Sequence, residues 1–172
     1  MRAVKHLNYC PNFSARSLRT KRTFLVALIA SDLGRSQVAP IVSGVEAFLR
    51  AHGYGLLIAN WERTPEWFGQ YSMHLLERGV EGVITIGVSP GKVFALPLVW
   101  VDLPGWQFPE PITPLKRQRL AAMGGAAAQS LLRQIERKTG GCTKVGIAPK
   151  PVSGMLPLET AVIVRLIVRP LF

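Results

Sequence analysis

Basic side chains concentrate at the beginning of the chain, where they could bind a polyanion. Residues 1–23, here called the arm, contain six Lys and Arg residues and no Asp or Glu, so they carry +6 of the formal net charge of +11. Clustered positive charge is typical of nucleic-acid binding, because each cation placed at a phosphate releases condensed counterions. The charge predicts nucleic acid as the first partner and an anionic membrane surface as the second, with a merely solvated basic tail as the alternative.

Catalytic patterns are absent from the sequence. No nucleophile elbow, Walker A loop or metal-binding triad occurs, and Gly124-Gly125 lacks the later glycine of a dinucleotide-binding fingerprint. The two cysteines, Cys10 and Cys142, match neither a disulfide framework nor a spaced metal cluster. We therefore expect a protein that is not an enzyme and that uses no cofactor or metal.

The distribution of apolar residues indicates a soluble protein. Of the 172 residues 48% are apolar, which is enough for one compact domain with a core and excludes a disordered chain. The apolar runs 24–30 and 161–164 are far shorter than the ~20 residues needed to span a bilayer. No secretory leader follows Met1, so we expect a cytoplasmic protein that does not enter a membrane.

Apolar runs and amphipathic segments alternate after the arm. Strands are predicted at 24–30, 55–60, 80–88, 98–102 and 144–148, and helices near 40–52, at 66–78 and within 115–137. The last of these regions forms either one long helix or a loop followed by a helix. In the helix at 66–78 the residues expected to face inward are Phe68, Tyr71, Leu75 and Leu76. The order of elements predicts an α/β fold with a doubly wound parallel sheet, because right-handed crossover helices join parallel strands.

Three parts follow from this organisation. Residues 1–23 form the arm, and residues 24–150 form a single α/β lobe. Several Pro and Gly residues interrupt the pattern from Pro149 onward, so residues 151–172 are expected to be an irregular C-terminal tail.

A short motif precedes the first apolar run. It reads Tyr9-Cys10-Pro11-Asn12, then Ala15-Arg16-Ser17-Leu18, followed by the basic residues 19–22. Further fragments follow in a characteristic order and spacing: Gly44-Val45-Glu46, His52-Gly53-Tyr54, residues 79–84, residues 96–102 and Gly124-Gly125. Together they resemble the lactose-repressor/galactose-repressor (LacI/GalR) family of transcription regulators over about residues 1–150, with the motif in the place of the family's hinge segment.

The resemblance implies a role in DNA binding for the motif. The hinge would fold into a short helix on DNA, and two such helices from a homodimer would enter the minor groove. Leu18 would act as the apolar wedge that opens a base step, since an inserted side chain kinks the duplex. Asn12 would contact phosphate near the helix start, Ala15 would allow close approach, and Arg16 and Arg19 would bind phosphates. The alternative for Leu18 is an apolar residue that packs the arm on the lobe.

The resemblance also implies a sensor lobe like that of periplasmic binding proteins, with a sugar or nucleobase as the small-molecule effector. Ligand groups should lie at the carboxyl ends of the strands. The residues expected there are Ser31, Asp32, Trp61 and Asp102, with Gln37 and Val38 at positions where the family often has Pro and Phe. The alternative is that both aspartates only cap loops and that Trp61 is a half-buried packing residue.

Two parts of such regulators have no counterpart in this sequence. The family places a helix-turn-helix before the hinge and a second lobe after the first. We therefore expect an incomplete LacI-type regulator that contacts DNA through its hinge and keeps a vestigial sensor lobe. The alternatives are a small-molecule or solute-binding module of the same fold with no DNA role, and a dimerisation partner that acts on an intact regulator.

Overall fold

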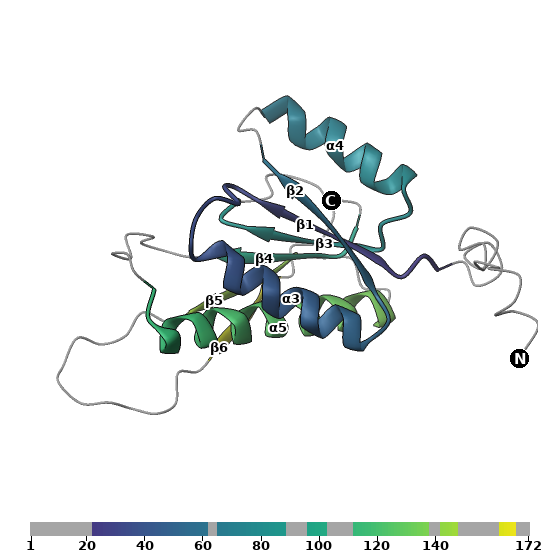
Figure 1. The fold of residues 1–172 in the computed structure, drawn as a ribbon. Helices are drawn as coiled ribbons and strands as arrows, with labels where there is room; N and C mark the ends of the chain where they lie inside the picture. The colour runs from purple at the N-terminus through teal and green to yellow at the C-terminus, as the bar shows by residue number, and fades with distance from the viewer. Residues whose placement is uncertain are drawn as a thin grey trace, which may run out of the picture.

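Six strands form one sheet in the order β2-β1-β3-β4-β5-β6 (Figure 1). The computed structural model describes residues 22–61, 65–88, 96–102, 112–137, 142–147 and 162–167, with the backbone alone at 65–70 and in the last two ranges. The elements are β1 (Leu25–Ala30), α3 (Val38–Ala51), β2 (Gly55–Asn60), α4 (Pro65–Glu77), β3 (Gly82–Ile86), β4 (Leu98–Asp102), α5 (Pro114–Arg137), β5 (Cys142–Ile147) and β6 (Val162–Ile167). The predicted alternation of strands and helices is confirmed, and region 115–137 is one long helix.

Five of the six strands are parallel, and the sixth differs from the prediction. β1 pairs in parallel with β2 and β3, β3 with β4, and β4 with β5. β6 instead runs antiparallel to β5, with Cys142 opposite Ile167 and Ile147 opposite Val162. Residues 162–167 thus form a strand where an irregular tail was expected over 151–172. Its run of Val and Ile favours a strand, but its antiparallel pairing with β5 depends on which strand edge the rest of the fold leaves open.

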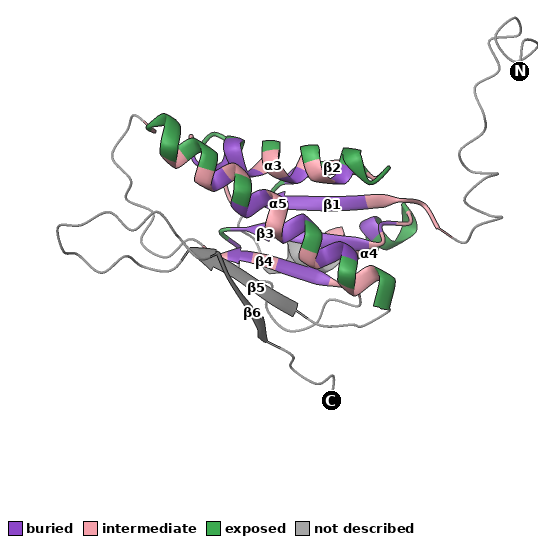
Figure 2. Ribbon diagram, turned by 90° about the horizontal axis from the view of Figure 1, so that it is seen from below, coloured by how far each residue is buried: buried purple, intermediate pink, exposed green. Residues whose placement is uncertain are grey.

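Helices α3 and α5 cover one face of the sheet. Val26, Leu28 and Ala30 of β1 point to this face and pack in one cluster with buried residues of both helices. Figure 2 shows β1 buried along most of its length. A strand covered on both faces needs a continuous apolar run, and β1 has one.

Helix α4 covers the opposite face. Its Leu75 is 1% exposed and packs with Ala27 and Ile29 of β1. Leu76 was expected to face inward as well, but it is 40% exposed. Successive residues lie about 100° apart around a helix, so Leu75 and Leu76 cannot both face the sheet directly. With helices on both faces, the doubly wound sheet is confirmed (Figures 1 and 2).

Helices α3 and α5 touch backbone to backbone. A Cβ on Gly44 would collide with the carbonyl oxygen of Ala121, and one on Gly124 would collide with that of Ile41. Small residues make up most of the stretch 123–128, and small side chains allow close packing. The structure shows that Gly124 serves the contact with α3, whereas Ala127 and Ala128 are buried in the core beside the sheet.

Substitution of Gly124 by Ala should therefore destabilise the lobe. We expect Gly124→Ala to lower the free energy of unfolding by roughly 1–3 kcal/mol, because the added methyl group forces two helix backbones apart. Gly125→Ala is the matched control, since the nearest atom to its Cβ would be the Gly44 carbonyl oxygen at 3.8 Å. Urea denaturation measures both, and equal stability of the two variants would contradict the close contact.

Candidate functional site

The proposed DNA-contacting residues lie outside the described residues. Asn12, Ala15, Arg16, Leu18 and Arg19 all precede residue 22, at which the description begins. Their roles, and the hinge helix itself, stay predictions.

The proposed effector residues follow strands that end at the same edge of the sheet. Ala30 of β1 lies opposite Asn60 of β2 and Ile86 of β3, and Ile86 lies opposite Val101 of β4. Ser31, Asp32, Trp61 and Asp102 therefore gather at the carboxyl edge of the parallel strands, as expected of a ligand site in an open α/β sheet. The Ser31 amide donates to the Ile86 carbonyl at 3.0 Å, and the Trp61 amide donates to the Ala30 carbonyl at 2.8 Å.

Asp32 organises the loop that follows β1. Its Oδ1 accepts a hydrogen bond from the Gly34 amide at 2.9 Å, and its Oδ2 lies 3.5 Å from Nε of Arg35. The next amide, that of Leu33, donates to Oδ1 of Asn60 at 3.2 Å. Sequence reasoning included Asn60 only as a strand residue, although a polar side chain that ends a strand at this edge is a signal for the site. The contacts of Asp32 are thus those of a residue that caps its own loop, which is the alternative given above.

The other proposed effector residues differ in exposure. Val38, the first residue of α3, is 1% exposed and packs in the core, so its side chain lies inside the lobe instead of at the edge. Gln37, the residue before α3, is 6% exposed. Ser31, Trp61 and Asp102 are half-buried, and Trp61 packs against the apolar cluster on the α4 side. A ligand at this edge would therefore meet the polar groups that end β1, β2 and β4 and the first turn of α3.

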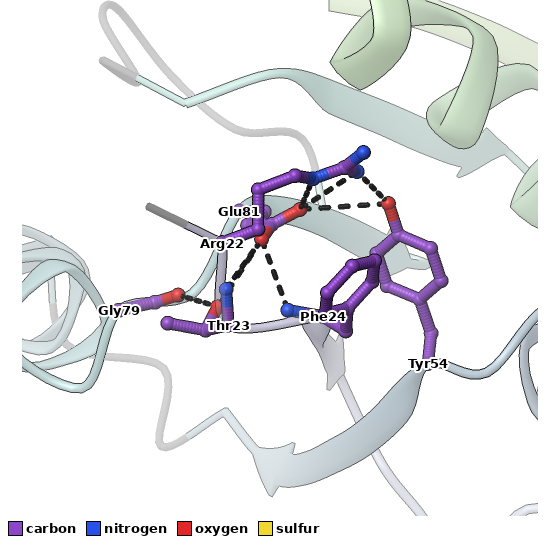
Figure 3. A network of polar contacts seen from close by, with 6 residues as sticks. All are labelled: Arg22, Thr23, Phe24, Tyr54, Gly79 and Glu81. Atoms are coloured by element: carbon purple, nitrogen blue, oxygen red, sulfur yellow. Dashed lines mark hydrogen bonds and ion pairs between the residues drawn. The ribbon is translucent and has the colours of Figure 1, made fainter. Parts of the chain in front are cut away.

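A second polar cluster lies at the opposite edge of the sheet, where the chain enters β1 (Figure 3). One carboxylate oxygen of Glu81, Oε1, accepts hydrogen bonds from the backbone amides of Thr23 at 2.7 Å and of Phe24 at 2.9 Å. The other, Oε2, lies 3.2 Å from Nη2 of Arg22 and accepts a hydrogen bond from the Tyr54 hydroxyl at 3.4 Å. Arg22 also donates to the Tyr54 hydroxyl. Glu81 thus binds the last residues of the arm to the lobe.

Aromatic rings complete this cluster. The rings of Phe24 and Tyr54 meet edge to face with centroids 5.4 Å apart. The guanidinium of Arg22 lies 4.8 Å from the centroid of Phe24 and 5.8 Å from that of Tyr54, which are cation–π distances. Sequence reasoning missed the cluster, although Glu81 is a single acid between the apolar Val80 and the strand β3.

The environment of Glu81 changes the pKa values of the cluster. Burial by itself would raise the pKa of Glu81, but hydrogen bonds from Phe24, Arg22 and Thr23, together with the charge of Arg22, hold it below its ordinary value of 4.5. Burial raises the pKa of the Tyr54 hydroxyl, and the charge of Arg22 only partly opposes this. Glu81 is therefore a carboxylate at neutral pH and Tyr54 a neutral donor.

Comparison with known proteins relates this lobe to transcription regulators. No family model matches the chain. The regulator PtxS of Pseudomonas aeruginosa is 36% identical over 107 residues, which are 59% of this chain and 32% of PtxS. The sucrose operon repressor of Pediococcus pentosaceus is 31% identical over 104 residues, 58% of this chain and 32% of the repressor. The chain is homologous to LacI-family transcriptional regulators.

The homology extends over most of the chain in one relative. The regulator KdgR of Bacillus subtilis is 22% identical over 156 residues, 91% of this chain and 45% of KdgR. The chain spans between about a third and a half of the length of these LacI-family relatives. Among solved structures, a Lac repressor bound to ONPG aligns with a TM-score of 0.48 and 22% identity, over 59% of this chain and 34% of that one.

Two further observations concern the described residues alone. None of their helices is long and apolar enough to cross a membrane. Within the same residues, His, Cys, Asp and Glu side chains do not gather in groups of three that could hold a metal ion.

Removal of the Glu81 carboxylate should make stability less dependent on pH. A folded-state pKa below 4.5 means that the carboxylate stabilises the lobe above about pH 4.5, and that this contribution is lost as the pH falls through the folded pKa. We expect Glu81→Gln to lower the free energy of unfolding at pH 7 by roughly 1–3 kcal/mol, with a smaller difference from wild type in acid. Urea unfolding across this pH range measures it, with the exposed Glu77→Gln as control. Parallel profiles for wild type and Glu81→Gln would contradict the assignment.

Proposed function

We propose that this chain is a LacI-type transcriptional regulator of the cytoplasm, in which the arm contacts DNA and the lobe carries a small-molecule sensor site. The observation that supports this most is the identity of 36% over 107 residues to PtxS, a transcriptional regulator. The curated relatives compared above are regulators and repressors, not enzymes or solute-binding proteins. The alternative of a solute-binding module without a DNA role is not favoured.

The arm supplies the DNA contact in this proposal. Its charge of +6 without an acidic residue suits a phosphate backbone. Arg16 and Arg19 would bind phosphates and position the protein, Asn12 would contact phosphate near the start of the hinge helix, and Leu18 would insert between bases with Ala15 close to the groove or the partner helix. Two arms are needed for the paired arrangement, so the proposal includes a homodimer.

The sensor site of the proposal is the carboxyl edge of the sheet. Ser31, Asp32, Trp61 and Asp102 gather there, and Asn60 and Gln37 join them. Val38 lies in the core, and we leave it out of the site. Two relatives are named as the sucrose operon repressor and the ribose operon repressor, which supports a sugar-like effector.

DNA binding should depend on salt and on the arm. We expect the full chain to bind random duplex DNA at low salt, and the double variant Arg16→Ala, Arg19→Ala to reduce the slope of log K against log salt concentration by about 0.9 for each lost phosphate contact. Leu18→Ala should weaken binding roughly tenfold with the slope unchanged, because it removes an apolar contact. Fluorescence anisotropy measures both quantities, and sedimentation velocity of the same samples reports the homodimer.

Two results would overturn parts of this function. Equal affinity of wild type and Leu18→Ala would exclude the wedge. Absence of binding by the wild-type chain at low salt would remove DNA from the function.

Effector binding should depend on the carboxyl edge. We expect ribose or sucrose to change the tryptophan fluorescence of the chain, and Asp102→Ala to weaken this binding about fivefold because one polar contact is lost. Trp61→Phe should reduce the signal, and Glu46→Gln on α3 should leave the affinity unchanged. Equal affinities of the wild type and the Asp102 variant would contradict this site.

A further inference from the structure

One carboxylate, that of Glu81, contacts all three residues of the junction between arm and lobe, residues 22–24 (Figure 3). We propose that Glu81 is a positioning residue that holds this junction on the lobe and so fixes the direction in which the arm leaves it. The proposal rests on the proposed function, because positioning matters when the arm must reach DNA. It goes beyond that function by assigning a residue that fixes the arm relative to the lobe, whereas the DNA contacts fix the arm relative to DNA.

Glu81 is itself fixed in place. It stands between α4 and β3, and its amide donates to the Leu25 carbonyl of β1 at 2.8 Å. The preceding residue, Val80, donates to the Leu75 carbonyl at the end of α4 at 3.0 Å. The Glu81 side chain is only 14% exposed. A carboxylate anchored by two elements of the lobe can therefore transmit the position of the lobe to the junction.

The junction is held from several directions. The Thr23 hydroxyl donates to the Gly79 carbonyl, and the Phe24 carbonyl accepts from the Gly55 amide of β2 at 2.8 Å. Together with the Glu81 contacts, these bonds connect the junction to β2 and to the turn before β3. The chain is thus fixed on both sides before it enters the centre of the sheet.

Phe24 shows that the junction depends on this support. Its φ of 54° lies in the left-handed region, which a bulky side chain rarely adopts. Such a conformation persists only where surrounding contacts impose it, and here they are the bond from the Phe24 amide to Glu81 and the packing of its ring on Tyr54. Without Glu81, we expect Phe24 to relax toward negative φ, which redirects every residue that precedes it.

Arg22 has a different task from the other cations of the arm. Its guanidinium pairs with Glu81 and lies over two aromatic rings, so its charge serves the attachment to the lobe. Of the cations that precede it, Arg16 and Arg19 are the ones assigned to phosphate, and Arg2, Lys5 and Lys21 add to the positive charge of the arm. The cluster thus marks the point at which the basic segment changes from a surface for DNA to a part of the lobe.

Amide hydrogen exchange in the full chain tests whether Glu81 holds the junction. We expect the amides of Thr23 and Phe24 to be protected in wild type and to lose at least tenfold of that protection in Glu81→Ala, with the core amide of Leu28 unchanged. Glu81→Gln should retain part of the protection because its carbonyl still accepts from these amides. Glu77→Gln removes the same charge elsewhere and should retain all of it. Unchanged protection in Glu81→Ala would overturn the proposal.

DNA affinity tests whether holding the junction positions the arm. Relative to Glu77→Gln, Glu81→Ala should bind duplex DNA about tenfold more weakly, since binding must then order at least one more backbone residue. Lost protection with an affinity equal to that of the control would show a structural contact only and overturn the positioning role. Failure of wild type to bind DNA would overturn the proposed function, while the exchange result still decides whether Glu81 holds the junction.

If Glu81→Ala does not fold, Tyr54→Phe is a milder test of the same cluster. Tyr54→Phe removes only the hydroxyl shared by Arg22 and Glu81 and leaves the ring that packs on Phe24. We expect it to reduce both the protection and the affinity in the same direction as Glu81→Ala but by less. No change in either quantity would count against the proposal.

Discussion

Burial of β1 on both faces is the constraint on which the rest of the lobe depends. Its alternate side chains enter two separate clusters, one under α3 and α5 and the other under α4. It also pairs with β2 on one side and β3 on the other. The strand therefore fixes both ends of the lobe: the junction with the arm precedes it, and the candidate effector edge follows it. A polar side chain inside β1 would be destabilising, because neither water nor an unpaired backbone group would be there to hydrogen-bond with it.

The contact of α3 with α5 shapes the face above β1. Gly44 and Gly124 bring the two helix backbones together, so α5 can lie beside α3 across the strands that follow. Both helices begin at the carboxyl edge, where α3 follows Gln37 and α5 follows the segment after β4. The same packing that forms the core thus places both helix starts toward the edge of the sheet at which β1 and β4 end (Figure 1).

Positive charge is densest in the arm. More than half of the net positive charge lies in the arm, and the partly buried carboxylate of Glu81 pairs with the last cation of that arm. The Glu81 pKa stays low despite burial because backbone amides and a guanidinium replace the water it lost. In the proposed function this junction matters, since an arm that contacts DNA is useful only if its position relative to the lobe is defined.

The sequence by itself determined the element types of the α/β lobe and the end of α3 at His52-Gly53, because hydrophobic periodicity and helix-end signals are local. It also determined the edge at which Ser31 and Asp102 lie, because both residues come at the ends of strands that alternate with helices along the chain. Exposure of Leu76, burial of Val38 and the antiparallel β6 were decided by tertiary structure. So was the role of Glu81, whose partners at residues 22–24 and 54 are distant along the chain. Contacts between distant segments depend on how elements pack together, and one sequence carries no local signal for them.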